Sequence, residues 1–184
     1  NIRTSGKICI SLKDKDELIG VKLTSENDLI LLGSSSGKLV KFNENEVRTM
    51  GRTASGVRGI NLDGGKCICL EVVNENDTIL IVTELGYGKK TSVSEYRQTK
   101  RGSKGVKALN ITEKNGTLVS VKLSDEEKDL IIMTNIGITI KIPINQLSKL
   151  GRATQGTRLI NLKDNQYVTT VSIVDKSLEH INEN

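Results

Sequence analysis

The stretch Thr99-Lys100-Arg101-Gly102-Ser103-Lys104-Gly105 contains three cations and two glycines and no apolar side chain. A strand-like run, Val106–Ile111, follows it directly. Glycine lets the backbone turn tightly and approach a ligand closely, and clustered Lys and Arg beside backbone N–H groups favour phosphate. The stretch therefore predicts an anion-binding loop that leads into a strand.

The same pattern recurs along the chain at a nearly constant interval. One set of glycines is spaced by 50, 49 and 51 residues: Gly6, Gly56, Gly105 and Gly156. A second set is spaced by 49 and 51 residues: Gly37, Gly86 and Gly137. Because the two sets drift in step, they indicate structural repeats, and a period near 50 residues is typical of propeller blades, arrays or solenoids.

Composition favours sheet. The apolar residues are mainly Ile, Leu and Val, with one Phe, no Trp and a single proline in 184 residues, which suits short β-branched strands packed face to face. No apolar run is long enough to span a membrane. The chain starts at Asn1, without Met and inside a repeat, so we expect a part of a longer protein. The net charge of +5 and the pI of about 9.1 are modest for a nucleic-acid binder, so the distribution of charge matters more than its sum.

Alternating apolar residues predict about four strands per repeat and an all-β, propeller-like array of four-stranded blades. We expect a hairpin around Ser34–Gly37 and one helical turn within Asn43–Met50. The predicted division is a closing strand of a preceding blade at 1–12, blades at 13–62, 63–112 and 113–174, and a polar tail at 175–184. The predicted strands are Lys7–Leu12, Leu18–Leu23, Leu29–Leu32, Lys38–Phe42, Val57–Leu62, Cys67–Val73, Thr78–Thr83, Lys89–Val93, Val106–Ile111, Thr117–Leu123, Leu130–Thr134, Ile138–Ile142, Thr157–Leu162 and Tyr167–Val174.

Charge is also sorted by its position in the repeat. Equivalent positions of stacked repeats lie on equivalent edges, so we expect the cations to line one rim and the acidic turns 14–17, 26–28, 75–77 and 125–129 to line another. The cations at fixed register are Arg52, Arg101 and Arg152, then Arg58, Lys107 and Arg158, and finally Lys41, Lys90 and Lys141.

No catalytic or metal-binding set is predicted. Cys67 and Cys69 alternate along a predicted strand, so we expect them on one face as small buried apolar residues rather than zinc ligands. The single histidine, His180, lies in the polar tail, which leaves no His-centred triad. The run Gly33–Leu39 resembles a phosphate loop but is one residue short and lacks the hydroxyl that would hold Mg²⁺. The tyrosines, Tyr87, Tyr96 and Tyr167, are interpreted as core or rim residues.

Three longer phrases resemble the C-terminal domain of the DNA gyrase A subunit, part of a type II topoisomerase. They are Gly86-Tyr87-Gly88-Lys89-Lys90-Thr91 with Ser94–Arg97 and the basic loop, Met50–Ile60, and Leu150–Ile160. The resemblance extends from Asn1 to Val174 and covers the second half of that domain. It implies a β-pinwheel of four-stranded blades, one strand of each donated by a neighbour, with a basic outer rim around which duplex DNA is wrapped.

The family's signature is the gyrase A box, Gln-Arg-Arg-Gly-Gly-Lys/Arg-Gly. Within Thr99–Gly105 it matches Arg101, Gly102, Lys104 and Gly105, with Lys100 in place of Arg, and it departs at Thr99 and Ser103. The resemblance and the fixed register together predict ten DNA-binding cations: Arg52, Arg58, Lys90, Lys100, Arg101, Lys104, Lys107, Lys141, Arg152 and Arg158.

The sequence thus predicts a domain that binds and wraps duplex DNA and performs no catalysis itself. Duplex is expected over single strands because few aromatic residues are available to stack bases. By the resemblance, the catalytic tyrosine lies outside this chain, ATP and Mg²⁺ act elsewhere in a cytoplasmic holoenzyme, and this chain carries no cofactor. Its implied protein partners are the gyrase B subunit plus the rest of the gyrase A subunit, in an A2B2 assembly. Two alternatives stay open: the related domain of topoisomerase IV, in its own A-type chain, and a kelch-like propeller for protein recognition, which shares the period.

Overall fold

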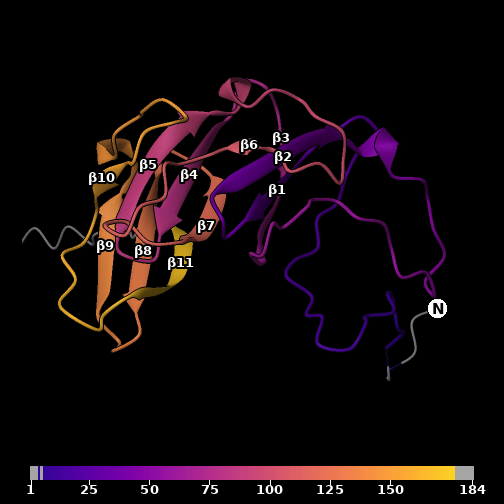
Figure 1. The fold of residues 1–184 in the computed structure, drawn as a ribbon, viewed down its shortest axis with the longest axis horizontal. Coiled ribbons are helices and arrows are strands. Elements are labelled where there is room, and N and C mark those ends of the chain that lie inside the picture. The colour runs from indigo at the N-terminus through magenta and orange to yellow at the C-terminus, as the bar shows by residue number, and fades with distance from the viewer. Residues whose placement is uncertain (1–3, 5, 177–184) are drawn as a thin grey trace, which may run out of the picture.

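The computed structural model describes residue 4 and residues 6–176. Its strands form three antiparallel sheets that follow one another along an arc (Figure 1). The first sheet has the order β3-β1-β2-β6, formed by β1 (Leu29–Ser34), β2 (Lys38–Asn43), β3 (Cys67–Val73) and β6 (Val106–Lys107). The second has the order β10-β5-β4-β7, formed by β4 (Thr78–Thr83), β5 (Tyr87–Ser92), β7 (Leu118–Leu123) and β10 (Thr157–Arg158). The third has the order β11-β8-β9, formed by β8 (Lys128–Thr134), β9 (Thr139–Pro143) and β11 (Val168–Asp175).

Each sheet is built around a tight hairpin, and the sequence explains its turn. Gly37, Gly86 and Gly137 all have a positive φ of about 80° (81°, 79° and 82°), which is the left-handed region where only glycine is unstrained. A hydroxyl at the start of each turn accepts a backbone N–H, as Thr83 Oγ1 does from Tyr87 at 3.2 Å. A 3₁₀ turn follows each hairpin: η1 (Glu44–Glu46), η2 (Val93–Glu95) and η3 (Ile144–Gln146). The all-β prediction, the hairpin and the helical turn after it are confirmed.

Strands are exchanged between repeats. The outer strand β6 pairs with β2 although a whole hairpin, β4–β5, separates them in the chain, and β10 pairs with β5 in the same way. The sheets therefore draw strands from across the intervals 13–62, 63–112 and 113–174. The division into blades at 13–62, 63–112 and 113–174 stays a prediction.

The core consists of apolar layers between the sheets. Leu31 and Leu39 of the first sheet pack in one cluster with Ile79 and Ile81 of the second. A second cluster joins Leu80 of the second sheet to the third. Since neighbouring residues of a strand point to opposite faces, Ile79 and Leu80 serve different layers, and the near-continuous apolar run of β4 is buried on both sides.

Several predicted strands are shorter than expected or absent. Val106–Ile111 and Thr157–Leu162 are strands over only two residues each, because the chain then leaves the sheet to cover a hairpin turn. Ile111 lies against Gly37 in this way, and Ile160 against Gly86. The predicted strands Lys7–Leu12, Leu18–Leu23 and Val57–Leu62 are not strands. Leu18–Leu23 contacts β3, where Lys22 pairs with Glu71 at 2.7 Å, and Val57–Leu62 packs on β1 and β2, but these contacts involve side chains. A strand also needs its backbone N–H and C=O groups to pair with a neighbour, and no such ladder forms here among the described residues. Many apolar side chains of the three segments are exposed, with Leu23 at 95%.

The two neighbouring cysteines do not share one face, contrary to the prediction. A β-bulge shifts the register between Gly33 and Ser34, so that Cys69 lies opposite Gly33 and Cys67 opposite Ser34. Cys69 joins the layer between the first two sheets, whereas Cys67 packs on the other face of the first sheet. An inserted residue reverses the alternation of side chains, which the sequence alone did not reveal.

In residues 6–176, no helix is long and apolar enough to cross a membrane. Most of the predicted polar tail, with His180, lies outside the described residues.

Candidate nucleic-acid interface

The basic loop Thr99–Gly105 lies against the outer edge of the first sheet. The N–H of Thr99 donates to the carbonyl of Lys41 on β2 at 2.7 Å. Gly105 has φ +69°, and a Cβ there would collide with the carbonyl oxygen of Leu39. Gly102 also has a positive φ, +75°. The two glycines therefore allow the loop to follow β2 at backbone contact distance.

Most backbone amides of this loop already donate within the protein, whereas the role of the loop as an anion site stays a prediction. The N–H of Arg101 donates to a carboxylate oxygen of Glu46 at 3.0 Å, and the N–H of Gly102 donates to the carbonyl of Gly59 at 2.6 Å. The N–H of Ser103 closes a turn onto Lys100. An anion bound here would therefore depend mainly on the side-chain cations.

Two arginines join the successive basic loops to one another. Arg101 donates from Nη1 to the carbonyl of Arg58 at 3.1 Å and from Nε to the carbonyl of Glu46 at 3.0 Å. Arg152 repeats the first contact one unit later, from Nη1 to the carbonyl of Lys107 at 2.6 Å. Each guanidinium therefore holds its own loop against a cationic residue of the preceding loop, Arg58 for Arg101 and Lys107 for Arg152.

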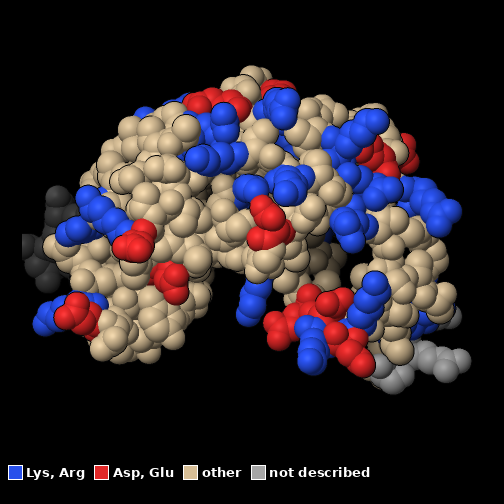
Figure 2. Space-filling model, in the orientation of Figure 1, with Lys and Arg blue, Asp and Glu red and all other residues tan. Residues whose placement is uncertain are grey.

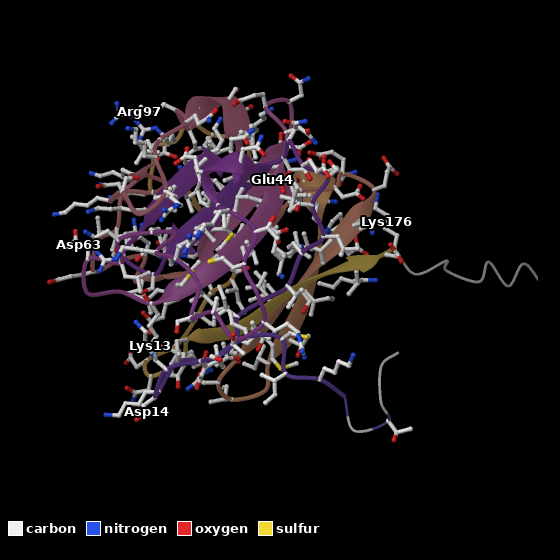
Figure 3. The ribbon with its side chains drawn as sticks, turned by 90° about the vertical axis from the view of Figure 1, so that its right-hand side faces the viewer. Lys13, Asp14, Glu44, Asp63, Arg97 and Lys176 are labelled. Atoms are coloured by element: carbon white, nitrogen blue, oxygen red, sulfur yellow. The ribbon has the colours of Figure 1, made fainter. Side chains whose placement is uncertain are left out.

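These contacts produce a continuous ladder of cationic segments, which we call the basic edge. It consists of residues 52–58, 100–107 and 152–158. Figure 2 shows Lys and Arg gathered over the middle and right of the convex side of the arc, and Figure 3 shows Arg97, just before the basic loop, projecting from the body. Six of the ten predicted cations are exposed on this edge: Arg52, Arg58, Lys100, Lys104, Lys107 and Arg158. Arg101 and Arg152 are half-buried within it.

The remaining two predicted cations lie elsewhere. Lys90 is buried, and its ammonium group binds both carboxylate oxygens of Glu126 at 2.9 Å and the carbonyl of Ile144 at 3.0 Å. It joins the second sheet to the third and does not present its charge to solvent. Lys141, at the same register on β9, is half exposed and lies 3.6 Å from Asp129.

The predicted separation of cations from carboxylates is incomplete. Glu95 accepts from the backbone N–H of Arg152 at 2.7 Å, as Glu46 does from that of Arg101. Asp63 forms an ion pair with Lys38 at 2.7 Å and lies 3.8 Å from Lys104, and these cations lower the pKa of its carboxyl group. Carboxylates thus lie on the basic edge, where they position backbone and neighbouring cations.

Sequence reasoning missed Lys89, whose side chain is fully buried. Its ammonium group donates to the carbonyls of Gly151 and Arg152 at 2.8 and 2.6 Å, beneath the third segment of the basic edge. Burial, more than the nearby charge of Arg152, lowers its pKa from 10.5 to about 8. The missed Glu46 and Glu95 did carry a signal, since they are 49 residues apart.

Comparison with known proteins places this geometry in a family. The family model described as the DNA gyrase C-terminal domain, beta-propeller, matches residues 1–25, 28–74, 77–125 and 128–175. The chain belongs to this family. The resemblance found in the sequence is therefore confirmed. The matched segments 28–74 and 77–125 each begin with a hairpin and end with a strand that belongs to the same sheet as that hairpin.

The curated relatives are gyrase A subunits. The chain is 46% identical over 185 residues to the DNA gyrase A subunit of Staphylococcus aureus (strain MRSA252), covering 99% of this chain and 21% of the relative. It is 46% identical over 178 residues to the DNA gyrase A subunit of Staphylococcus epidermidis (strain ATCC 12228), covering 95% and 20%. The chain thus spans about a fifth of the length of these relatives.

Solved structures agree with the fold. A DNA gyrase A C-terminal domain superposes with a TM-score of 0.81 at 27% identity, covering 92% of this chain and 58% of that one. The C-terminal domain of a DNA topoisomerase IV superposes with a TM-score of 0.84 at 24% identity, covering 91% and 53%. The second likeness concerns the fold alone.

Proposed function

We propose that this gyrase A C-terminal domain binds duplex DNA along the basic edge and bends it around the convex side of the arc. The observation that carries the proposal is the ladder of exposed cations at constant register. Arg58, Lys107 and Arg158 recur once per repeat, and the contacts of Arg101 and Arg152 hold their loops side by side. The phosphates of a duplex are also regularly spaced. Regularly spaced cations can therefore contact successive phosphates of the DNA backbone, whereas recognition of one base would need a single local site.

Wrapping follows from the same arrangement. Cations on a convex surface neutralise phosphates on one side of the duplex, and the contacts made along the curve offset the elastic cost of bending, which is about 1–6 kcal/mol for a site of 20–30 base pairs. A bent segment held in this way presents a crossing of fixed handedness to the strand-passing machinery. In the longer protein this role would support ATP-dependent negative supercoiling.

The finer parts of the proposal extend beyond this chain. We place the catalytic tyrosine, the ATP site and Mg²⁺ in other parts of a cytoplasmic A2B2 assembly with the gyrase B subunit. This chain itself is assigned no cofactor and no catalysis. Support for gyrase over topoisomerase IV comes from the matching family model and from the gyrase A relatives at 46% identity. A kelch-like role in protein recognition has no such support.

The basic loop offers a direct test. Lys100 and Lys104 are both exposed, so the double substitution Lys100→Ala with Lys104→Ala removes two charges without breaking the ladder. Each lost phosphate contact lowers the slope of log affinity against log salt by about 0.9, so the double variant should lower it by about 2, equally for duplexes of different sequence. Binding to random-sequence duplexes across a salt series measures this slope.

A matched control removes the same charge elsewhere. Lys13 and Lys15 lie on either side of Asp14 in the exposed acidic turn, and Figure 3 shows Lys13 and Asp14 at the opposite end of the molecule from Arg97. The double substitution Lys13→Ala with Lys15→Ala should leave the slope nearly unchanged. Equal falls for both pairs would mean that DNA follows no particular edge. Tighter binding to a single strand than to a duplex of equal length would also contradict the proposal.

A further inference from the structure

A hollow at one end of the basic edge is not explained by a simple ladder of cations. It has a volume of about 310 Å³ and lies where the turn between β4 and β5 meets two loops, one before β7 and one after β10. Among the residues that line it are Leu85, Tyr87, Lys114, Arg158 and Lys163. Lys114 is more than 40 residues from Arg158 and Lys163 in the sequence, so the fold brings it beside them.

The hollow has an excess of positive charge. Within residues 6–176, Lys114, Arg158 and Lys163 form no ion pair, and Asp164 is the single carboxylate on the wall. The first sheet differs at the corresponding place. Lys38 of β2 lies opposite Lys107 of β6, just as Tyr87 of β5 lies opposite Arg158 of β10. There, Asp63 neutralises Lys38 at 2.7 Å.

The guanidinium of Arg158 is held in place before any ligand arrives. Arg158 donates from Nη2 and Nε to the Tyr87 hydroxyl at 2.9 and 3.2 Å, and from Nη1 to Asn161 at 2.9 Å. Lys114 Nζ lies 5.8 Å from the centre of the Tyr87 ring. Donation from Arg158 lowers the pKa of Tyr87. A guanidinium has five N–H groups, so two of those on Arg158 stay available to a ligand.

We propose that this hollow is a seat for one phosphate group. Lys114 and Lys163 supply charge from either side, and the fixed guanidinium of Arg158 supplies paired donors, which is the geometry that planar recognition of phosphate uses. Tyr87 is a positioning residue that orients Arg158. The seat deepens the proposed DNA binding and rests on it where the phosphate belongs to a duplex; a free phosphate ion has the same chemistry.

The first test uses duplex DNA across a salt series. Lys114→Ala should lower the salt slope by about 0.9. Tyr87→Phe keeps the ring and changes no charge, so it should weaken binding about threefold to tenfold and leave the slope unaltered. Lys66→Ala, which removes one exposed lysine from the corresponding loop of the first sheet, is the matched control and should shift the slope less than Lys114→Ala does. If the wild-type chain does not bind duplex, the proposed function fails. If it binds, and Lys114→Ala and Lys66→Ala are alike, only the seat fails.

The second test separates the two sources of phosphate, and its first arm uses no DNA. Amide resonances of Tyr87, Asn115 and Gln166 are followed by NMR while inorganic phosphate replaces chloride at constant ionic strength, and then while a short duplex is added. Shifts with both probes assign the seat to phosphate in general, and shifts with the duplex alone assign it to the DNA backbone. No localised shift with either probe overturns the proposal.

Discussion

Lys90 and Lys141 occupy the same register of the repeat, yet their surroundings differ. The Lys90 side chain is 6% exposed and lies between the second and third sheets, whereas that of Lys141 is 52% exposed. Lys41, one repeat earlier, behaves like Lys90: it binds Glu75 at 2.7 Å and the carbonyl of Val93 at 3.2 Å. A lysine at this position is buried where another sheet follows and supplies a carboxylate and a carbonyl.

The difference shows that position in the repeat determines where on its sheet a residue lies, but not whether its side chain is buried or exposed. In the described residues no further sheet covers β9, so Lys141 keeps only Asp129 as a partner. The same contrast holds at the hairpin turns. A Cβ on Gly86 would meet Ile160, including its carbonyl oxygen at 2.9 Å, whereas a Cβ on Gly137 would meet nothing within 4 Å.

The turns give the largest expected effect. Gly86→Ala should lower the free energy of unfolding by about 2–5 kcal/mol, because strain at positive φ adds to overpacking against the backbone of Ile160. Gly137→Ala carries the strain alone and should cost about 1–2 kcal/mol. Urea unfolding of both variants measures the gap, and equal losses would show that the Ile160 segment does not constrain the turn.

Lys89 sharpens the comparison through pH. Its register is occupied by Val40 and Ile140 in the other two hairpins, and its pKa is lowered from 10.5 to about 8. Between these values the unfolded chain holds a proton that the folded chain has released, so this group's contribution to stability rises with pH, by at most about 3 kcal/mol. It becomes constant well below pH 8, where the folded and unfolded chains both hold the proton.

The measurement is the stability of wild type minus that of Lys89→Met from pH 7.5 to 10.5. This difference removes the other groups whose titration differs between the two states, among them Tyr96, which titrates in this range in the unfolded chain and whose pKa burial raises in the folded one. The difference should increase with pH. A flat profile would mean that the carbonyls around Lys89 compensate fully for its burial.

Loss of the partner of Lys90 should have a smaller effect on stability. Glu126→Ala leaves the ammonium group of Lys90 with the carbonyl of Ile144 as its remaining acceptor and should cost about 1–3 kcal/mol, since a buried charged donor loses a partner. Lys141→Ala removes an exposed charge and should change stability by less than about 0.5 kcal/mol. Thermal unfolding at low and high salt checks both, and comparable losses would contradict the assignment of Lys90 to the contact between sheets.

The arginines of the basic edge give the smallest expected gap. Arg101→Ala breaks bonds to the carbonyls of Glu46 and Arg58 and should cost about 1 kcal/mol, whereas exposed Arg52 makes no such bond among the described residues, and Arg52→Ala should be nearly neutral. If Arg101→Ala is as neutral as Arg52→Ala, its guanidinium is free to bind phosphate directly, and its role is not positional.

By itself the sequence determined the repeat, the hairpins and the edge on which the cations lie. The spacing of glycines located the turns, because left-handed φ is cheap only for glycine, and the near-continuous apolar run located strands that are buried on both faces, such as Thr78–Thr83. Both signals depend on residues close in the sequence, so they can be recognised without knowing what packs against the segment. The fixed register and the resemblance to the gyrase A box added ten predicted cations, of which six are exposed on the basic edge.

Only the tertiary structure decided which cations are available. Lys90 is withdrawn from solvent by Glu126 and Ile144, and Arg101 is half-buried by its bonds to the preceding loop. Lys7–Leu12 has the alternating pattern of a strand but pairs with no strand among the described residues. These outcomes depend on strands and carbonyls dozens of residues away, and one period of a repeat contains no information about whether the next unit packs against it.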